Sequence, residues 1–254
     1  MYTSIAAYHF VVVDDPAALV VRIRAWAEAQ DLLGTVLVAD EGINLFLAGS
    51  EAGIGAFLAL LRGDARFAGL QAKSSRSHTQ PFARLKVKHK PEIISFRRDG
   101  VSPLDGRAPA VAPADLARWI ARGRDDDGRR LVLLDTRNRE EVGHGTFAGA
   151  LTLPIDNFTD LPAALVPHRE ALADAIVVGF CTGGIRCEKA VRWMRDAGFG
   201  HALQLDGGIL GYFEATGGAG YEGRCFVFDE RIALDPGLRA AADRCSAHSA
   251  GRAR

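Results

Sequence analysis

Strand-like and helix-like patterns of apolar residues follow one another along the first hundred residues. Residues 16–30 place Leu19, Ile23 and Trp26 at helical spacing, and the apolar runs on either side are typical of strands. The pattern predicts strands at residues 5–13, 34–39, 43–48, 70–74 and 84–96, and helices at residues 16–30 and 51–61, the second capped by Ser50. This order is that of the ferredoxin-like fold, so we expect residues 1–98 to form an α+β ferredoxin-like domain.

A change of composition separates this region from a second one. Residues 99–114 are rich in Pro, Gly, Asp and Arg and lack a hydrophobic period, which is typical of a linker. The pattern then predicts helices at residues 115–122 and 188–197 and strands at residues 131–134, 151–154, 175–180 and 202–205. Strands separated by helical stretches indicate an α/β domain with a mainly parallel sheet over residues 115–222. We expect residues 223–254 to form a C-terminal extension that ends in a mobile tail.

Length and charge narrow the class of protein. A chain of 254 residues is long enough for two domains that each bury a core. Lys and Arg balance Asp and Glu at 31 each, so an argument for binding nucleic acid must come from local clusters of charge. No basic segment opens the chain and no apolar run approaches the roughly 20 residues that span a bilayer, so we expect a cytoplasmic protein without membrane contact. The oligomeric state is left open.

The cysteines point to free thiols and to no metal site. Cys181, Cys187, Cys225 and Cys245 are too few for a disulfide scaffold, and thiols stay reduced in the cytoplasm. No CxxC pair occurs, and the cysteines and histidines do not have the spacing of a zinc site. We therefore predict no bound metal.

One cysteine stands where a predicted strand meets a predicted helix, in the run Cys181-Thr182-Gly183-Gly184-Ile185-Arg186. Two glycines let the backbone curl so that N–H groups point inward, and the following helix adds the positive end of its dipole. In such a setting the pKa of a cysteine can fall from about 8.5 to roughly 3.5–7.5, which makes it a nucleophile. Four residues separate Cys181 from Arg186, one fewer than a cysteine phosphatase usually needs for a phosphate, so the ring suits sulfur. The alternative is a buried cysteine beside a glycine turn.

These motifs resemble a known family. The run from Cys181 to Arg186, with residues 134–137 (LDTR) and 205–209 (LDGGI), resembles the rhodanese domain, in which the loop cysteine carries a persulfide. The longer string at residues 181–190 (CTGGIRCEKA), with residues 41–44 (EGIN), 145–147 (GTF) and 225–231 (CFVFDER), is similar to the bacterial tRNA uridine hydroxylases. The resemblance covers about residues 5–235. It implies hydroxylation of the wobble uridine, position 34 of tRNA, to 5-hydroxyuridine, with molecular oxygen as co-substrate.

Two departures from that family are visible. Leu45 and Phe46 follow Asn44, where members often have Gly-Thr. Many members also carry a cysteine-rich C-terminal extension, whereas this tail has only Cys245, which again favours the absence of a metal site.

Other residues near the loop have a structural and a chemical interpretation. Cys187 follows Arg186 and either resolves a persulfide or sulfenate on Cys181 or fills a niche at the helix start. Asp135 ends a strand, and we expect an ion pair between Arg137 and Glu140 or Glu141, which serves either a salt-bridged turn or catalysis. Residues 206–208 (DGG) are predicted to make a tight turn under the active loop.

A cluster of basic residues gives the argument for a partner. Arg84, Lys86, Lys88 and Lys90 alternate with other residues, so in a strand all four project from one face; we call them the basic stripe. Residues 71–98 contain eight Lys or Arg and only one acidic residue, Glu92. A phosphate backbone needs such an excess, although a solvated strand face has the same pattern. With the family resemblance, the expected partner is the anticodon stem-loop of tRNA. Tyr8, Phe10 and Phe82 could stack on a base or belong to the core.

Three functions follow from these features. The first is the tRNA hydroxylase, in which the Cys181 thiolate adds to uridine C6 or a persulfide or peroxidised sulfur is the active species. The second is a sulfurtransferase that passes sulfur from Cys181 to an acceptor, and the third is a non-catalytic RNA-binding module. No dinucleotide fingerprint and no set of two histidines and a carboxylate occur, so we predict no cofactor in the protein and only oxygen as co-substrate.

Overall fold

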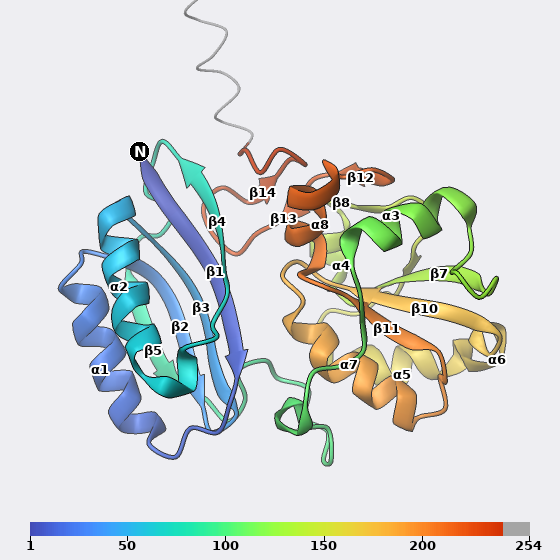
Figure 1. The fold of residues 1–254 in the computed structure, drawn as a ribbon, viewed down its shortest axis with the longest axis horizontal. Coiled ribbons are helices and arrows are strands. Elements are labelled where there is room, and N and C mark those ends of the chain that lie inside the picture. The colour runs from blue at the N-terminus through green and yellow to red at the C-terminus, as the bar shows by residue number, and fades with distance from the viewer. Residues whose placement is uncertain (241–254) are drawn as a thin grey trace, which may run out of the picture. The chain divides into compact units, whose positions relative to one another are not determined.

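A computed structural model of the protein describes residues 1–240, which form two compact units (Figure 1). The first unit comprises residues 1–94 together with residues 228–232 and 238–240, and the second comprises residues 95–227 and 233–237. Cys245 and most of the predicted tail lie outside the described residues. No helix within residues 1–240 is long and apolar enough to cross a membrane.

The first unit has the predicted ferredoxin-like fold with one added strand. Its elements are β1 (Tyr2–Phe10), α1 (Pro16–Glu28), β2 (Leu33–Ala39), β3 (Gly42–Gly49), α2 (Glu51–Gly63), β4 (Ala72–Ser77) and β5 (Leu85–His89). The strand order is β4-β1-β3-β2-β5, in which β2 and β5 are parallel and the other pairs antiparallel. The strand predicted at residues 84–96 ends at His89, and the last hydrogen bond to β2 beyond it is from Lys90 N to the Val38 carbonyl at 2.8 Å.

Both helices of this unit cover one face of the sheet (Figure 1). Strand β3 turns Ile43, Leu45 and Leu47 toward them, and α1 buries Leu19 and Ile23 as its spacing predicts. The Ser50 hydroxyl accepts a hydrogen bond from Gly53 N at 3.0 Å, which confirms the predicted cap of α2. Residues of even number in β3 and β5 therefore face away from the helices.

The second unit is an α/β domain with a five-stranded parallel sheet, as predicted. Its strand order is β6-β11-β10-β7-β9. The sheet strands are β6 (Ala110–Val111), β7 (Arg130–Asp135), β9 (Leu151–Thr152), β10 (Ala175–Phe180) and β11 (Ala202–Leu205), and the helices are α3 (Pro113–Arg122), α4 (Arg139–Val142), α5 (Leu161–Leu165), α6 (Arg169–Leu172), α7 (Ile185–Asp196) and α8 (Gly208–Thr216). Figure 1 shows α3 and α8 on one side of this sheet and α5 and α7 on the other.

Short strands complete the unit and correct the predicted boundaries. Strand β12 (Tyr221–Gly223) pairs with β8 (Gly145–Phe147), and β13 (Cys225–Phe226) pairs with β14 (Ala233–Leu234). Strand β6, the edge of the sheet, lies within the segment predicted to be a linker; two residues are too few to show a period. Helix α7 begins at Ile185, three residues before its predicted start, because Gly184 supplies the left-handed conformation at its N-cap.

Candidate active site

Cys181 lies directly after β10, the central strand of the parallel sheet, where ligands bind in open α/β sheets. Its sulfur accepts a hydrogen bond from Gly184 N at 3.2 Å. Gly184 has a φ of 101°, whereas Gly183 has no left-handed φ and a Cβ there would meet no atom within 4 Å. The prediction that both glycines curl the loop is thus correct for Gly184 alone.

The N-terminus of α8 supports the loop from below. Ile209 N donates to the carbonyl of Cys181 at 2.9 Å, and Leu210 N donates to the carbonyl of Thr182 at 3.1 Å. Gly208 has a φ of 62°, and a Cβ on it would lie 2.5 Å from the Cys181 carbonyl oxygen. The predicted tight turn under the loop is confirmed, and its second glycine is required by both conformation and space.

The surroundings of the Cys181 sulfur favour its thiolate. Burial of the sulfur opposes ionisation, but a hydrogen bond from Cys187, the charge of Arg186 and the backbone N–H groups of Arg186 and Gly184 outweigh it and lower the pKa to about 6. At neutral pH the sulfur is therefore mostly a thiolate, as the loop pattern predicts.

Cys187 lies in the first turn of α7, fully buried. Burial and the neighbouring negative sulfur of Cys181 raise the pKa of Cys187 well above its ordinary value, so it remains a thiol. Its sulfur lies 3.6 Å from the hydroxyl of Thr136, which in turn donates to the carbonyl of Phe180 at 3.0 Å. As a thiol, Cys187 carries the S–H that donates to the Cys181 sulfur and helps to lower the pKa of Cys181.

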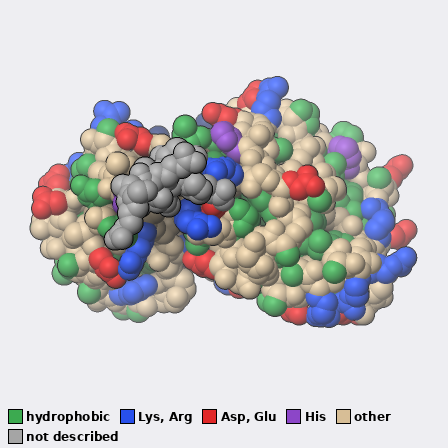
Figure 2. All heavy atoms as spheres, turned by 90° about the horizontal axis from the view of Figure 1, so that it is seen from above, with side chains coloured by type: hydrophobic (Ala, Val, Ile, Leu, Met, Phe, Trp, Pro, Cys, Tyr) green, Lys and Arg blue, Asp and Glu red, His purple; other side chains and the backbone are tan. Residues whose placement is uncertain are grey.

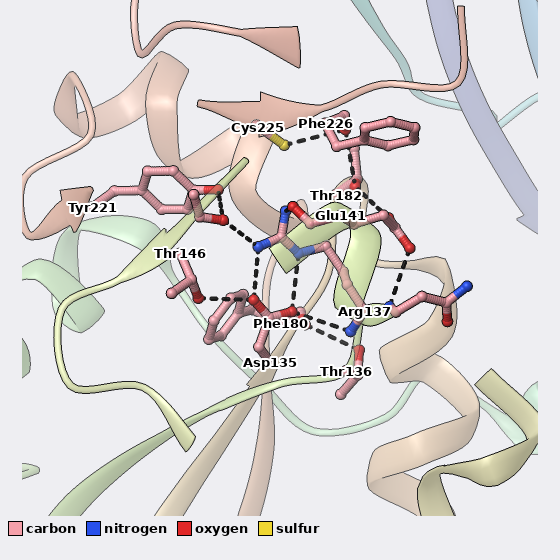
Figure 3. A network of polar contacts seen from close by, with 12 residues as sticks. Asp135, Thr136, Arg137, Glu141, Thr146, Phe180, Thr182, Tyr221, Cys225 and Phe226 are labelled. Atoms are coloured by element: carbon pink, nitrogen blue, oxygen red, sulfur yellow. Dashed lines mark hydrogen bonds and ion pairs between the residues drawn. The ribbon is translucent and has the colours of Figure 1, made fainter. Parts of the chain in front are cut away.

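Asp135 and Arg137 form a fully buried ion pair (Figure 3). Arg137 Nε and Nη2 donate to the two oxygens of Asp135 at 2.9 and 2.6 Å, and Nη2 also donates to the carbonyl of Gly145 at 2.6 Å. The Thr146 hydroxyl donates to Asp135 at 2.8 Å. These hydrogen bonds connect the end of β7 to β8 and so support the carboxyl end of the sheet beside the loop.

The expected ion pair between Arg137 and Glu140 or Glu141 is therefore wrong. Glu140 is exposed, and Glu141 instead pairs with Arg186 at 2.8 Å. The sequence could not distinguish these partners, because α4 is a single turn and shows no period. Asn138 followed by Glu141 does have the pattern of a helix start, which is the one signal that points to Glu141.

The β12–β13 segment closes the site on another side. Tyr221 donates its hydroxyl to the Gly145 carbonyl at 2.7 Å, and the Thr182 hydroxyl lies 3.4 Å from the Phe226 carbonyl (Figure 3). Burial raises the pKa of Cys225 to about 12, so this third cysteine is a thiol at neutral pH. Within residues 1–240 no three His, Cys, Asp or Glu side chains are grouped to hold a metal ion.

The basic stripe lies on β5, one of the two edge strands of the first unit's sheet. Only Lys86 and Lys88 lie within β5, and Arg84 and Lys90 directly flank it. Val87 is buried in the core on the helix side, so Lys86 and Lys88 face the opposite side of the sheet; Lys86 is half-buried and Lys88 exposed. Figure 2 shows acidic, basic and apolar side chains intermixed over the face that it presents, in keeping with the net charge of zero.

Tyr8 and Phe10 are half-buried on β1 and their rings meet edge to face, with centroids 5.9 Å apart. Phe82, before β5, is also half-buried. None of the three belongs to the buried core beneath the helices.

Comparison with known proteins supports the division into two kinds of domain. Residues 2–93 match the family described as UPF0176 acylphosphatase like domain, and residues 113–215 match the rhodanese-like domain. Among solved structures, a human single-domain sulfurtransferase is 30% identical and covers 42% of this chain and 96% of its own, with a TM-score of 0.36. Acylphosphatase from Bacillus subtilis is 16% identical and covers 35% of this chain and 99% of its own, with a TM-score of 0.29.

Relatives match nearly the whole chain. A Xanthomonas euvesicatoria protein named tRNA uridine(34) hydroxylase is 66% identical over 243 residues, which cover 96% of this chain and 98% of that protein. A Xylella fastidiosa protein of the same name is 62% identical over 234 residues, which cover 92% of this chain and 91% of that protein. Both units and the active loop fall within these matches, and the chain belongs to the tRNA uridine(34) hydroxylase family.

Proposed function

We propose that this protein is an oxidoreductase that hydroxylates uridine 34 of tRNA to 5-hydroxyuridine. The observation that carries the proposal is the identity of 62–66% to relatives of that name across both units. The active loop suits the role, because it holds a buried sulfur whose pKa is lowered to about 6 at the carboxyl end of the central strand of a parallel sheet.

Cys181 is the reacting group of this proposal. Its thiolate adds to uridine C6, which makes C5 electron-rich enough to react with molecular oxygen. One oxygen atom stays on C5 and the other leaves as water, while an external thiol reductant supplies two electrons and two protons and becomes a disulfide; Cys181 departs from C6 unchanged. A persulfide on Cys181 is the alternative active species, and both routes require this sulfur.

The direct test is hydroxylation of unmodified tRNA by the purified protein with oxygen and a thiol reductant, followed by mass spectrometry of the nucleosides. We expect 5-hydroxyuridine from the wild type and none from Cys181→Ser. A gene deletion should lower the modified nucleoside in total tRNA, and only the wild-type gene should restore it. Absence of product in vitro together with unchanged nucleosides in the deletion strain would contradict the proposal.

A sulfurtransferase is the second candidate, because residues 113–215 match the rhodanese-like domain. It predicts that thiosulfate leaves a persulfide on Cys181 which cyanide or another thiol removes. Rapid turnover in that assay, with no hydroxylation of tRNA, would favour this alternative.

We propose that the basic stripe contacts the tRNA backbone. The charge reversal Lys86→Glu with Lys88→Glu should weaken tRNA binding and, if each lysine neutralises one phosphate, lower the slope of log K against log salt by about 1.4 to 1.8. Arg76→Glu is the matched control, since Arg76 lies on β4 and pairs with Glu51 on the helix side. Equal salt slopes for the double variant and the wild type would identify the stripe as a solvated face.

A further inference from the structure

Glu141 is a buried carboxylate whose predicted partner was Arg137, yet it contacts two side chains of the active loop. Its Oε2 lies 2.8 Å from Arg186 Nη2, and its Oε1 lies 3.5 Å from the Thr182 hydroxyl. Only 2% of Glu141 is exposed. A charged group is this deeply buried only when it is paired, and Arg186 is the cation that pairs with this carboxylate.

The position of Glu141 is itself held by the backbone. Its Oε2 also accepts a hydrogen bond from Asn138 N at 3.2 Å, within the first turn of α4. That turn is attached to the rest of the unit, because Arg139 N donates to the Ile155 carbonyl at 2.9 Å and the Arg139 side chain pairs with Asp156. The Glu141 carboxylate is therefore held in one position, and the Arg186 guanidinium pairs with it there.

We propose that Glu141 is a positioning residue of the reaction: it holds Arg186 where the guanidinium stabilises the Cys181 thiolate. This inference rests on the proposed function for its use in tRNA hydroxylation, but its effect on the sulfur is independent of that reaction. Glu141 touches no reacting atom in this scheme and acts through Arg186.

Removal of Glu141 should change the pKa of Cys181 in the direction opposite to that expected from the charge of Glu141 alone. A negative charge near the loop disfavours a thiolate, so if Glu141 acted through its own charge, removing it would lower the Cys181 pKa. If it acts by holding Arg186, removing it releases the guanidinium and raises that pKa. The pKa of Cys181 in Glu141 variants thus separates the two readings.

The experiment measures the rate of alkylation of Cys181 by iodoacetamide against pH in the full-length protein, with mass spectrometry to identify the modified cysteine. For Glu141→Ala we expect the pKa to rise by about one unit and the rate at pH 6 to fall about fivefold. Glu141→Asp keeps the charge but is one methylene too short to reach Arg186, so its pKa should also rise. Glu140→Ala, an exposed carboxylate in the same turn, is the matched control and should leave the rate unchanged.

A double-variant comparison tests whether the effect passes through Arg186. Adding Glu141→Ala to Arg186→Ala should change the alkylation rate no further, because the group that Glu141 positions is already absent. A lowered or unchanged pKa in Glu141→Ala or Glu141→Asp, or an additive effect in the double variant, would overturn the proposal. Thermal unfolding of each variant shows whether it is folded. If Glu141→Ala does not fold, the pKa of Cys181 in Glu141→Asp is the test. Failure of the wild type to hydroxylate tRNA, with these pKa changes present, would overturn the proposed function alone.

Discussion

Gly208→Ala is the substitution that most directly tests how the active loop is supported. A Cβ at Gly208 would lie 2.5 Å from the Cys181 carbonyl oxygen, 2.7 Å from Gly184 N and 2.8 Å from the Gly183 carbonyl carbon. All three are backbone atoms, so no side chain can move away to relieve the overlap. The loop or α8 must shift, and Gly184 N is the group that donates to the Cys181 sulfur.

Two terms make up the expected loss of stability. The φ of 62° places an alanine in the left-handed region, which costs about 1–2 kcal/mol. Overlap with a packed backbone adds about 1–3 kcal/mol. The free energy of unfolding should therefore fall by about 2–5 kcal/mol, and displacement of Gly184 N should also raise the pKa of Cys181.

Gly217→Ala is the matched control, because it isolates the first of these terms. Gly217 ends the same helix with a φ of 66°, and a Cβ there would meet no atom within 4 Å. Urea unfolding should show a loss of about 1–2 kcal/mol for Gly217→Ala, with Cys181 alkylation unchanged. Equal stability losses in the two variants, or a wild-type alkylation profile in Gly208→Ala, would refute the reasoning that α8 supports the loop by close contact.

Three further predictions concern the buried charges and thiols. Asp135→Asn leaves the Arg137 charge without its carboxylate and should lower the free energy of unfolding by about 3–5 kcal/mol, against about 1 kcal/mol for Thr146→Val, both measured in urea. The rate of Cys181 alkylation should be half-maximal near pH 6, and a midpoint near 8.5 would contradict the loop electrostatics. The pKa of Cys181 is lower in the folded than in the unfolded protein, so the thiolate adds stability relative to Cys181→Ser. This added stability should rise as pH increases from about 6 to 8.5 and vanish below that range. Cys187→Ala should raise the Cys181 pKa while Cys187→Ser, which keeps a donor, should not; loss of tRNA hydroxylation in both variants with an unchanged pKa would instead support a resolving thiol.

Elements bounded by clear breakers could be predicted from the sequence. The strands at residues 175–180 and 202–205 have the predicted bounds, because each is an apolar run that ends at a polar or glycine-rich turn. Their place in a parallel sheet brings Cys181 to the carboxyl end of the central strand, so the position of this cysteine was also predictable.

Contacts between short, distant segments could not be predicted. Which of Glu140 and Glu141 faces inward depends on one turn of helix, and the partner of Glu141 lies 45 positions away in Arg186. Strand β6 has two residues and is defined only by its pairing with β11. The sequence contains the residues that make such contacts, but these segments are too short for a hydrophobic period that would show which residues face each other.

Residues beyond the rhodanese-like match also contact the active loop. That match ends at residue 215, whereas the Thr182 hydroxyl lies 3.4 Å from the carbonyl of Phe226 in β13. Two residues later the chain joins the first unit, where Arg231 donates to the Ser75 hydroxyl at 2.7 Å and Glu230 N donates to the Pro81 carbonyl at 3.0 Å. It then returns as β14 to pair with β13. One short segment thus contacts both the active loop and the sheet that carries the basic stripe, and neither domain match contains this segment.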